Sequence, residues 1–225
     1  MPFTGTNYKL RLDATLRAPV NLQPFMHFYL ALGDSYTIGE GLSPKESFPY
    51  QLAGILRAQN IDVADPVIIA TTGWTTNELW EAIQEHHLTE TFSFVTLLIG
   101  VNNQYRGGSL DTYAAEFERL LLQAISFAGG NAGRVLVLSI PDWGCTPYAG
   151  TRDRAQIAKE IDAFNEVNRR ITAAHHCLYT DVTGISRAHC APGEQLVADE
   201  LHYSAAHYQL WAAQAAPILN KALTT

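Results

Sequence analysis

The sequence has few charged residues and no hydrophobic run long enough to cross a bilayer. Asp, Glu, Lys and Arg make up 16% of its 225 residues, and the formal net charge is −7. Nucleic acids and anionic membranes both attract clustered Lys and Arg, so an acidic balance disfavours them as partners. The longest apolar runs, such as residues 135–140, fall far short of the roughly 20 residues that a membrane-spanning helix needs. We therefore expect neither a nucleic-acid partner nor stable membrane insertion.

Cysteine is also scarce. Cys145, Cys177 and Cys190 are too few for a disulfide framework, so free thiols are favoured, with a Cys177–Cys190 pair as the alternative. The histidines show no familiar metal-ligand spacing, and the glycine-rich turn at residues 33–41 lacks both phosphate-binding spacings. We expect no metal and no cofactor.

Residues 1–25 differ from the rest of the chain. They combine Gly5, Pro19 and Pro24 with little sustained periodicity, and Met26 stands directly before the first strong strand pattern. We predict an N-terminal extension or leader ahead of a domain spanning residues 26–225. The alternative is a short strand and loop, because residues 8–12 alternate apolar and polar side chains. No apolar core of a secretory signal is seen, so a cytoplasmic location is the default expectation and secretion stays open.

From residue 26 onward, apolar runs alternate with segments of helical periodicity. The predicted strands are residues 27–32, 67–71, 94–99, 134–140 and 177–182. The predicted helices are residues 48–59, 75–86, 110–128, 152–174 and 204–219, the last beginning at Ser204 and ending near Pro217. Continuous apolar strands indicate burial on both faces, as in a parallel sheet. The pattern predicts an α/β fold: a three-layer α/β/α sandwich around a doubly wound sheet of about five parallel strands.

Polar residues gather where these strands end. Ser35 follows the first strand, Gly73 the second and Asn102 the third, while Asp199 and His202 precede the last helix. Ligands of doubly wound sheets bind beyond the carboxyl ends of the strands. These five residues are therefore expected at one rim of the sheet.

Together they can carry out nucleophilic catalysis. A serine hydroxyl needs a base to take its proton, and a histidine oriented by a nearby carboxylate is such a base. The N–H groups of Ser35 and Gly73 and the Asn102 amide can donate to a developing oxyanion. Taken singly, each residue also has a common structural interpretation as a helix cap, a turn residue or a surface histidine. Their joint placement in chain order favours catalysis.

At these residues the chain resembles a GDSL esterase of the SGNH hydrolase superfamily. The four blocks of that family are matched by Gly33-Asp34-Ser35, by Gly73, by Gly100-Val101-Asn102 and by Asp199 with His202. The resemblance implies a flavodoxin-like sheet, Ser35 as nucleophile, His202 as base and Asp199 as its orienting residue. It also implies an oxyanion hole made by Ser35, Gly73 and Asn102.

Two positions depart from the family pattern. Tyr36 stands where the family usually has an aliphatic residue, so we expect it to narrow or line the pocket. Asn103 stands where an Asp usually follows the Asn, which puts a supporting contact in doubt.

The substrate is less defined than the chemistry. Trp74, Tyr105, Trp143 and Tyr148 are candidates for an aromatic wall, and Arg106 for a substrate phosphate or carboxylate. A small-molecule ester is expected, cleaved by a small-ester carboxylesterase or a lysophospholipase-type enzyme. The alternatives are an acetyl- or acyltransferase or carbohydrate acetylesterase with the same triad, and a non-catalytic binding protein. Oligomeric state is left open.

Overall fold

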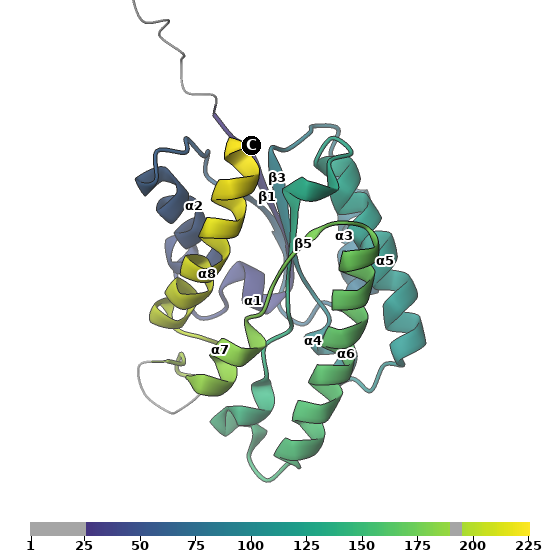
Figure 1. Cartoon of the computed structure of the whole chain (residues 1–225). Coiled ribbons are helices and arrows are strands. Elements are labelled where there is room, and N and C mark those ends of the chain that lie inside the picture. Colours follow the sequence, from purple (N-terminus) through teal and green to yellow (C-terminus); the bar gives the residue numbers. More distant parts are fainter. Residues whose placement is uncertain (1–25, 190–194) are drawn as a thin grey trace, which may run out of the picture.

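The computed structural model describes residues 26–189 and 195–225 (Figure 1). The expected N-terminal extension lies outside the described residues. So does Cys190, and with it the alternative of a Cys177–Cys190 pair. Cys145 and Cys177 are half-buried.

Within the described residues, five short strands form one parallel sheet through the centre of the fold. They are β1 (Tyr29–Gly33), β2 (Val67–Ala70), β3 (Phe94–Leu98), β4 (Val135–Leu138) and β5 (Leu178–Thr180). Their spatial order is β2-β1-β3-β4-β5, the flavodoxin-like doubly wound order. Every residue of β1, β3 and β4 is buried, which explains their unbroken apolar sequences. The expected fold class is confirmed.

Helices cover both faces of the sheet (Figure 1). One face carries α2 (Phe48–Ala58) and α8 (Ala205–Thr224), which pack against each other, and the other carries α3 (Thr76–His86), α5 (Leu110–Phe127) and α6 (Arg154–Ala174). The short helices α1 (Ser35–Ile38), α4 (Val101–Tyr105) and α7 (Thr183–Ala188) lie toward the carboxyl ends of the strands. Single 3₁₀ turns are η1 (Pro44–Glu46), η2 (Ala132–Arg134), η3 (Trp143–Cys145) and η4 (Pro147–Ala149).

The last helix extends further than its sequence predicts. Ser204 caps its start as expected, but α8 continues through Pro217 to Thr224. A proline inside a helix removes one backbone hydrogen bond and usually ends or bends it. Here Leu219 and Leu223, beyond the proline, are both buried. Burial of this apolar face outweighs the lost hydrogen bond, so the predicted end at residue 219 is wrong.

The register brings three strand ends to one level. Gly33, the last residue of β1, pairs with Ala70 of β2 and Leu98 of β3. A Cβ on Gly33 would collide with the Thr37 side chain and the carbonyl oxygen of Leu98. Glycine is thus required where β1 turns into α1, and the segments that follow β1, β2 and β3 start side by side. Within residues 26–189 and 195–225, no helix is long and apolar enough to cross a membrane.

Candidate active site

Ser35 is the first residue of α1, immediately after β1. The helix is capped by Asp34, whose side chain accepts a hydrogen bond from the backbone N–H of Tyr36 at 3.1 Å. It ends after one turn at Gly39, where φ is 78°, a conformation that glycine adopts without strain. The Ser35 residue is only 4% exposed. A tight strand–helix junction therefore holds the hydroxyl at the rim of the sheet.

Asp199 and His202 lie on a tight loop before α8. The loop is closed by a bridge between Leu196 and Tyr203. Asp199 Oδ1 accepts hydrogen bonds from the backbone N–H groups of Leu201 and His202, both at 2.9 Å. Its other oxygen, Oδ2, lies 2.6 Å from His202 Nδ1. Because an ionised carboxylate only accepts, Nδ1 carries the proton and Nε2 presents its lone pair.

The hydrogen bonds on Asp199 affect its ionisation. Partial burial opposes the charged form, but the hydrogen bonds from His202 and Leu201 outweigh it and hold the pKa of Asp199 below its ordinary value. The carboxylate is therefore ionised at neutral pH, as the orientation of the imidazole requires.

Gly73 and Asn102 come from the turns after β2 and β3. Gly73 has a φ of 88° in the turn between β2 and α3. Asn102 lies in the first turn of α4, and its Nδ2 donates to the carbonyl oxygen of Trp74 at 2.9 Å. The amide group has two N–H protons, so one remains for another acceptor. Backbone and side-chain donors thus meet at this part of the rim.

These residues line a single cleft of about 140 Å³. Its lining comprises Ser35, Tyr36, Thr72, Gly73, Val101, Asn102, Tyr105, Trp143, Tyr148, Leu201 and His202. Of the triad expected from the sequence, Ser35 and His202 line the cleft and Asp199 reaches it through His202. No group of three or more His, Cys, Asp or Glu suited to a metal ion occurs among the described residues.

An aromatic wall bounds the cleft on the side of β4. Trp143 is almost fully buried, and its Nε1 donates to Gln104 Oε1 at 2.8 Å. Gln104 Nε2 in turn donates to Glu160 of α6 at 2.7 Å. The rings of Tyr105 and Tyr148 pack edge-on against Trp143, at centroid distances of 5.3 and 6.2 Å. The wall is consequently fixed by polar contacts behind it as well as by ring packing.

Two expected substrate contacts point elsewhere. Trp74 is outside the cleft lining and packs, half-buried, against the hydrophobic core. Arg106 is outside it too, and its guanidinium contacts the Gly73 carbonyl and Glu78. Sequence reasoning missed three lining residues, Thr72, Val101 and Leu201. Thr72 and Val101 directly precede Gly73 and Asn102, and Leu201 precedes His202, so adjacency to the motif residues was the available signal.

The first departure from the family pattern, Tyr36, is fully buried and packs against His202. Its ring lies 5.6 Å from those of His202 and Tyr203 and 6.2 Å from that of Trp211. It lines the cleft, as expected, and it also supports the loop that carries His202.

The second departure, Asn103, joins α4 to the start of α3. Its Oδ1 accepts from the backbone N–H of Thr76 at 3.0 Å, and its Nδ2 donates to the Thr76 hydroxyl at 2.7 Å. An amide supplies both a donor and an acceptor, so Asn serves this pair of contacts directly.

Asp34, beside Ser35, is a buried carboxyl group. Burial raises its pKa to about 7, and the hydrogen bond from the Tyr36 N–H opposes this rise. Among the described residues its Oδ2 has no hydrogen-bond partner. Near pH 7 Asp34 is therefore only partly ionised, which reduces the average negative charge next to Ser35.

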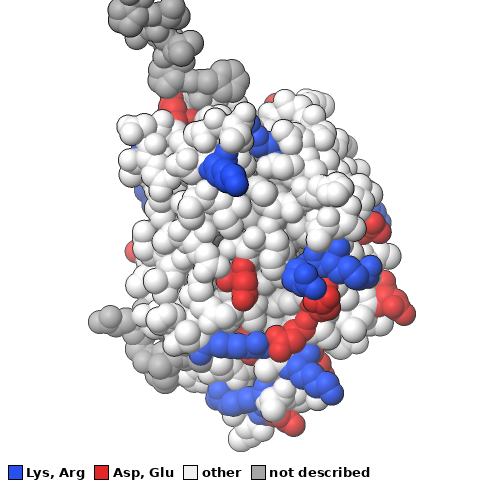
Figure 2. Space-filling view, viewed as in Figure 1, with Lys and Arg blue, Asp and Glu red and all other residues white. Residues whose placement is uncertain are grey.

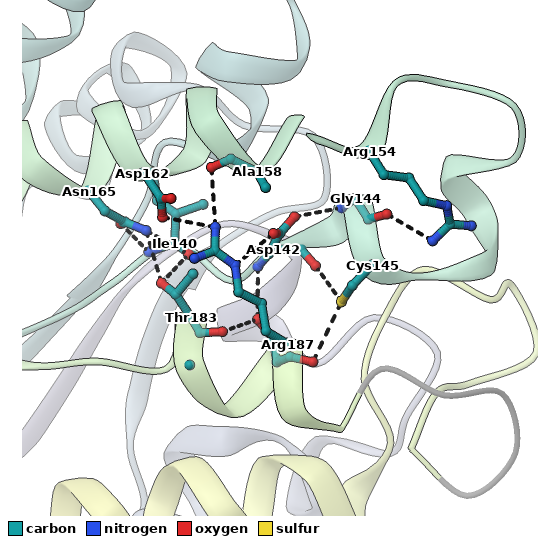
Figure 3. Close-up of polar contacts among 12 residues, drawn as sticks. Ile140, Asp142, Gly144, Cys145, Arg154, Ala158, Asp162, Asn165, Thr183 and Arg187 are labelled. Atoms are coloured by element: carbon teal, nitrogen blue, oxygen red, sulfur yellow. Dashed lines mark hydrogen bonds and ion pairs between the residues drawn. The ribbon is translucent and has the colours of Figure 1, made fainter. Parts of the chain in front are cut away.

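Polar contacts also hold the segment that carries Trp143 (Figure 3). Asp142 is buried, and its Oδ2 pairs with Arg187 Nε of α7 at 2.8 Å. Arg187 Nη2 reaches Asp162 of α6, also at 2.8 Å. Arg154 donates to the carbonyl oxygen of Gly144 at 2.9 Å. The turn after β4 is thus attached to both α6 and α7.

A flavodoxin-like sheet with a serine and a hydrogen-bonded His–Asp pair at its rim is the arrangement of an α/β serine hydrolase. Comparison with protein families agrees: the model of the GDSL-like lipase/acylhydrolase family matches residues 31–210, and the chain belongs to this family. Membership of this family assigns the class of activity, which is ester hydrolysis, but does not identify the substrate. Comparison with curated proteins gives no match.

Solved structures share the fold at low sequence identity. A lipase/acylhydrolase from Enterococcus faecalis is 24% identical, with a TM-score of 0.66 over 87% of this chain and 96% of that one. TesA is 19% identical, with a TM-score of 0.68 over 87% and 99%. Axe2, an acetylxylan esterase from Geobacillus stearothermophilus, is 17% identical, with a TM-score of 0.65 over 88% and 94%. At such identities the likeness establishes the fold alone.

Proposed function

We propose that the protein is a serine carboxylic-ester hydrolase that works through Ser35, His202 and Asp199. The observation that carries the proposal is the 2.6 Å contact between His202 Nδ1 and Asp199 Oδ2, in the cleft that Ser35 lines. This contact favours the tautomer whose Nε2 accepts a proton, which a serine nucleophile requires.

In the proposed reaction Ser35 Oγ attacks the ester carbonyl carbon while His202 Nε2 takes the hydroxyl proton. The carbonyl oxygen becomes an oxyanion that accepts hydrogen bonds from the Ser35 N–H, the Gly73 N–H and the Asn102 amide. His202 then gives its proton to the departing alkoxide, which leaves as the alcohol. Water, deprotonated by the same histidine, attacks the acyl-enzyme carbonyl carbon. The bond from this carbon to Ser35 Oγ then breaks, Oγ takes the proton back from His202, and the carboxylic acid is released.

The cleft supports a small or single-chain acyl ester as substrate. Its lining is mostly apolar, with Val101, Leu201 and the aromatic wall facing the space beside Ser35. Apolar walls with a few convergent polar groups are typical of small-molecule sites. We propose a small-ester or lysophospholipase-type carboxylesterase.

The test is Ser35→Ala assayed on p-nitrophenyl esters of increasing acyl length. Removal of a serine nucleophile is expected to lower kcat/KM by roughly 10⁵-fold or more. Ser109→Ala is the control, because Ser109 caps α5 and its loss tests the cost of removing a serine hydroxyl at the start of a helix that lies outside the cleft lining. A folded Ser35→Ala protein that retains most of the esterase rate would contradict the proposal.

The ester assay combined with covalent labelling separates the other classes of function. A fluorophosphonate reports a reactive Ser35 independently of turnover. Labelling with slow hydrolysis that is accelerated by an added sugar or alcohol would identify a transferase. Neither labelling nor turnover would identify a non-catalytic binding protein.

A further inference from the structure

The turn that carries Gly73 has few hydrogen bonds within itself. Thr71 and Thr72 are exposed, and a backbone bond of 3.3 Å from the Trp74 N–H to the Thr71 carbonyl closes the turn. Gly73 has no side chain and sits at a φ of 88°. Glycine loses more conformational freedom on ordering than any other residue. A fixed N–H at this position therefore needs restraints from outside the turn.

Arg106 supplies such a restraint. Its Nη2 donates to the carbonyl oxygen of Gly73 at 2.6 Å. Its Nη1 donates to both carboxylate oxygens of Glu78, at 3.3 and 3.1 Å. Glu78 is itself fixed in the first turn of α3, where it accepts from the backbone N–H of Thr75 at 2.7 Å. Glu78 thus fixes the guanidinium of Arg106, and this guanidinium in turn fixes the Gly73 turn.

Arg106 and Asn102 act on consecutive peptide groups. The backbone N–H of Arg106 donates to the Asn102 carbonyl at 3.1 Å, so the two residues are one helical turn apart. Asn102 Nδ2 donates to the Trp74 carbonyl, and Arg106 Nη2 donates to the Gly73 carbonyl. Two side chains of one short segment therefore bind two successive carbonyl oxygens of the Gly73 turn.

The other side of the turn is attached to the nucleophile segment. Thr72 Oγ1 hydrogen-bonds Glu40, and the Glu40 N–H donates to the Ser35 carbonyl at 3.1 Å. The three segments that carry Ser35, Gly73 and Asn102 are in this way joined by side chains of Glu40, Arg106 and Asn102.

We propose that Arg106 is a positioning residue of the oxyanion hole, which fixes the Gly73 turn against α4 so that the Gly73 N–H and the Asn102 amide converge on one oxygen. The inference rests on the proposed function. It differs from substrate binding, because the guanidinium contacts Gly73 and Glu78 of the protein and Arg106 does not line the cleft. The planar guanidinium serves Gly73 and Glu78 at once, which an ammonium group cannot do with the same geometry.

The test compares Arg106→Ala with Arg169→Ala on p-nitrophenyl acetate. Arg169 pairs with Glu166 on α6 at similar exposure and has no contact with the turn, so its loss should leave kcat unchanged. For Arg106→Ala we expect kcat to fall about 10- to 100-fold, because the donor is displaced rather than removed. KM should stay within about twofold, since the interaction acts on the transition state. Arg106→Lys should recover part of the loss.

A double-mutant cycle with Asn102→Ala and the conservative variant Glu78→Gln test the role of Arg106 independently. Arg106→Ala should cost much less in an Asn102→Ala background, because both act on the same oxyanion. Glu78→Gln retains the capping interaction at the start of α3 but removes the charge that orients Arg106, and it should lower kcat in the same direction. It also provides the answer if Arg106→Ala does not fold.

The outcomes distinguish the two proposals. A wild-type protein that labels with fluorophosphonate while Arg106→Ala keeps its kcat would overturn the role of Arg106 alone. A raised KM with unchanged kcat, or independent effects of the Arg106 and Asn102 variants, would also overturn it. Absence of both labelling and turnover in the wild type would overturn the proposed function, and the positioning role with it.

Discussion

Asp199 is oriented by hydrogen bonds more than by burial. Its side chain is 42% exposed, whereas that of His202 is 9% exposed. Both carboxylate oxygens accept hydrogen bonds from its own loop, two from backbone N–H groups and one from the imidazole. A carboxylate held in this manner stays ionised and still orients the imidazole ring. Replacement of Asp199 should therefore affect activity more than its small buried area implies.

Asp199→Asn should therefore leave the fold intact and remove most of the activity. The amide nitrogen cannot accept the Nδ1 proton, and the imidazole then favours the tautomer that protonates Nε2. We expect kcat to fall roughly 10³- to 10⁴-fold at neutral pH with little change in melting temperature. The control is Asp65→Asn, which removes an exposed carboxylate that pairs with Arg57 and is distant in sequence from Asp199. A loss below about tenfold would mean that Asp199 does not orient the base.

Residue positions and side-chain directions differ in how far the sequence predicts them. The positions of Ser35, Gly73, Asn102 and His202 follow from strand ends and motif spacing, and all four line the cleft. The direction of Arg106 depends on Glu78, a partner 28 residues away that no local pattern connects to it.

At the scale of elements, the strands and the long helices were predictable and the short helices were not. The apolar runs place all five strands of the described residues, and each strand end lies within about two residues of its prediction. Helices α1 and α4 contain only four and five residues. Such helices are too short to show a periodic face, and they form because strand ends and packed neighbours fix their geometry. They nevertheless carry Ser35 and Asn102.

His207, in the first turn of α8, makes the stability of the native state depend on pH. It is fully buried, its ring stacks on Tyr203 at 4.1 Å, and its Nδ1 lies 3.3 Å from Gln195 Oε1. Burial, with repulsion from nearby His189, lowers the pKa of His207 to about 4. Between pH 6.5 and 4 the unfolded chain binds a proton here that the native state does not. Acidification over this range therefore favours unfolding.

His207→Phe keeps a ring in place and removes the titration. The wild type's free energy of unfolding, relative to that of the variant, should decrease by roughly 3 kcal/mol as the pH falls from 7 to 4. Urea unfolding at several pH values measures this difference. The comparison must be differential because the raised pKa of Asp34 acts in the opposite sense, stabilising the native state as the pH falls from about 7. A difference that does not vary with pH would contradict the assignment.

At the scale of the whole molecule, charges of both signs alternate over α6 and α7. Figure 2 shows acidic and basic side chains side by side on this face of the molecule. The ion pairs on α6 and α7 include Arg169–Glu166 and Arg187–Asp162. The pairs differ in what lies beneath them. Arg169 and Glu166 are both exposed, whereas Arg187 also covers Asp142, whose side chain is only 3% exposed.

Removal of Arg187 should thus destabilise the whole molecule more than removal of Arg169. Arg187→Met leaves the Asp142 carboxylate buried without its guanidinium, and because Arg187 is partly exposed we expect a loss of about 2–3 kcal/mol in the free energy of unfolding. Arg169→Met should cost less than about 1 kcal/mol. In urea unfolding, adding Asp142→Asn to Arg187→Met should restore part of the loss, because no buried charge remains. Equal losses for the two arginine variants would show instead that the Asp142–Arg187 pair stabilises the turn that carries Trp143 no more than a surface pair would.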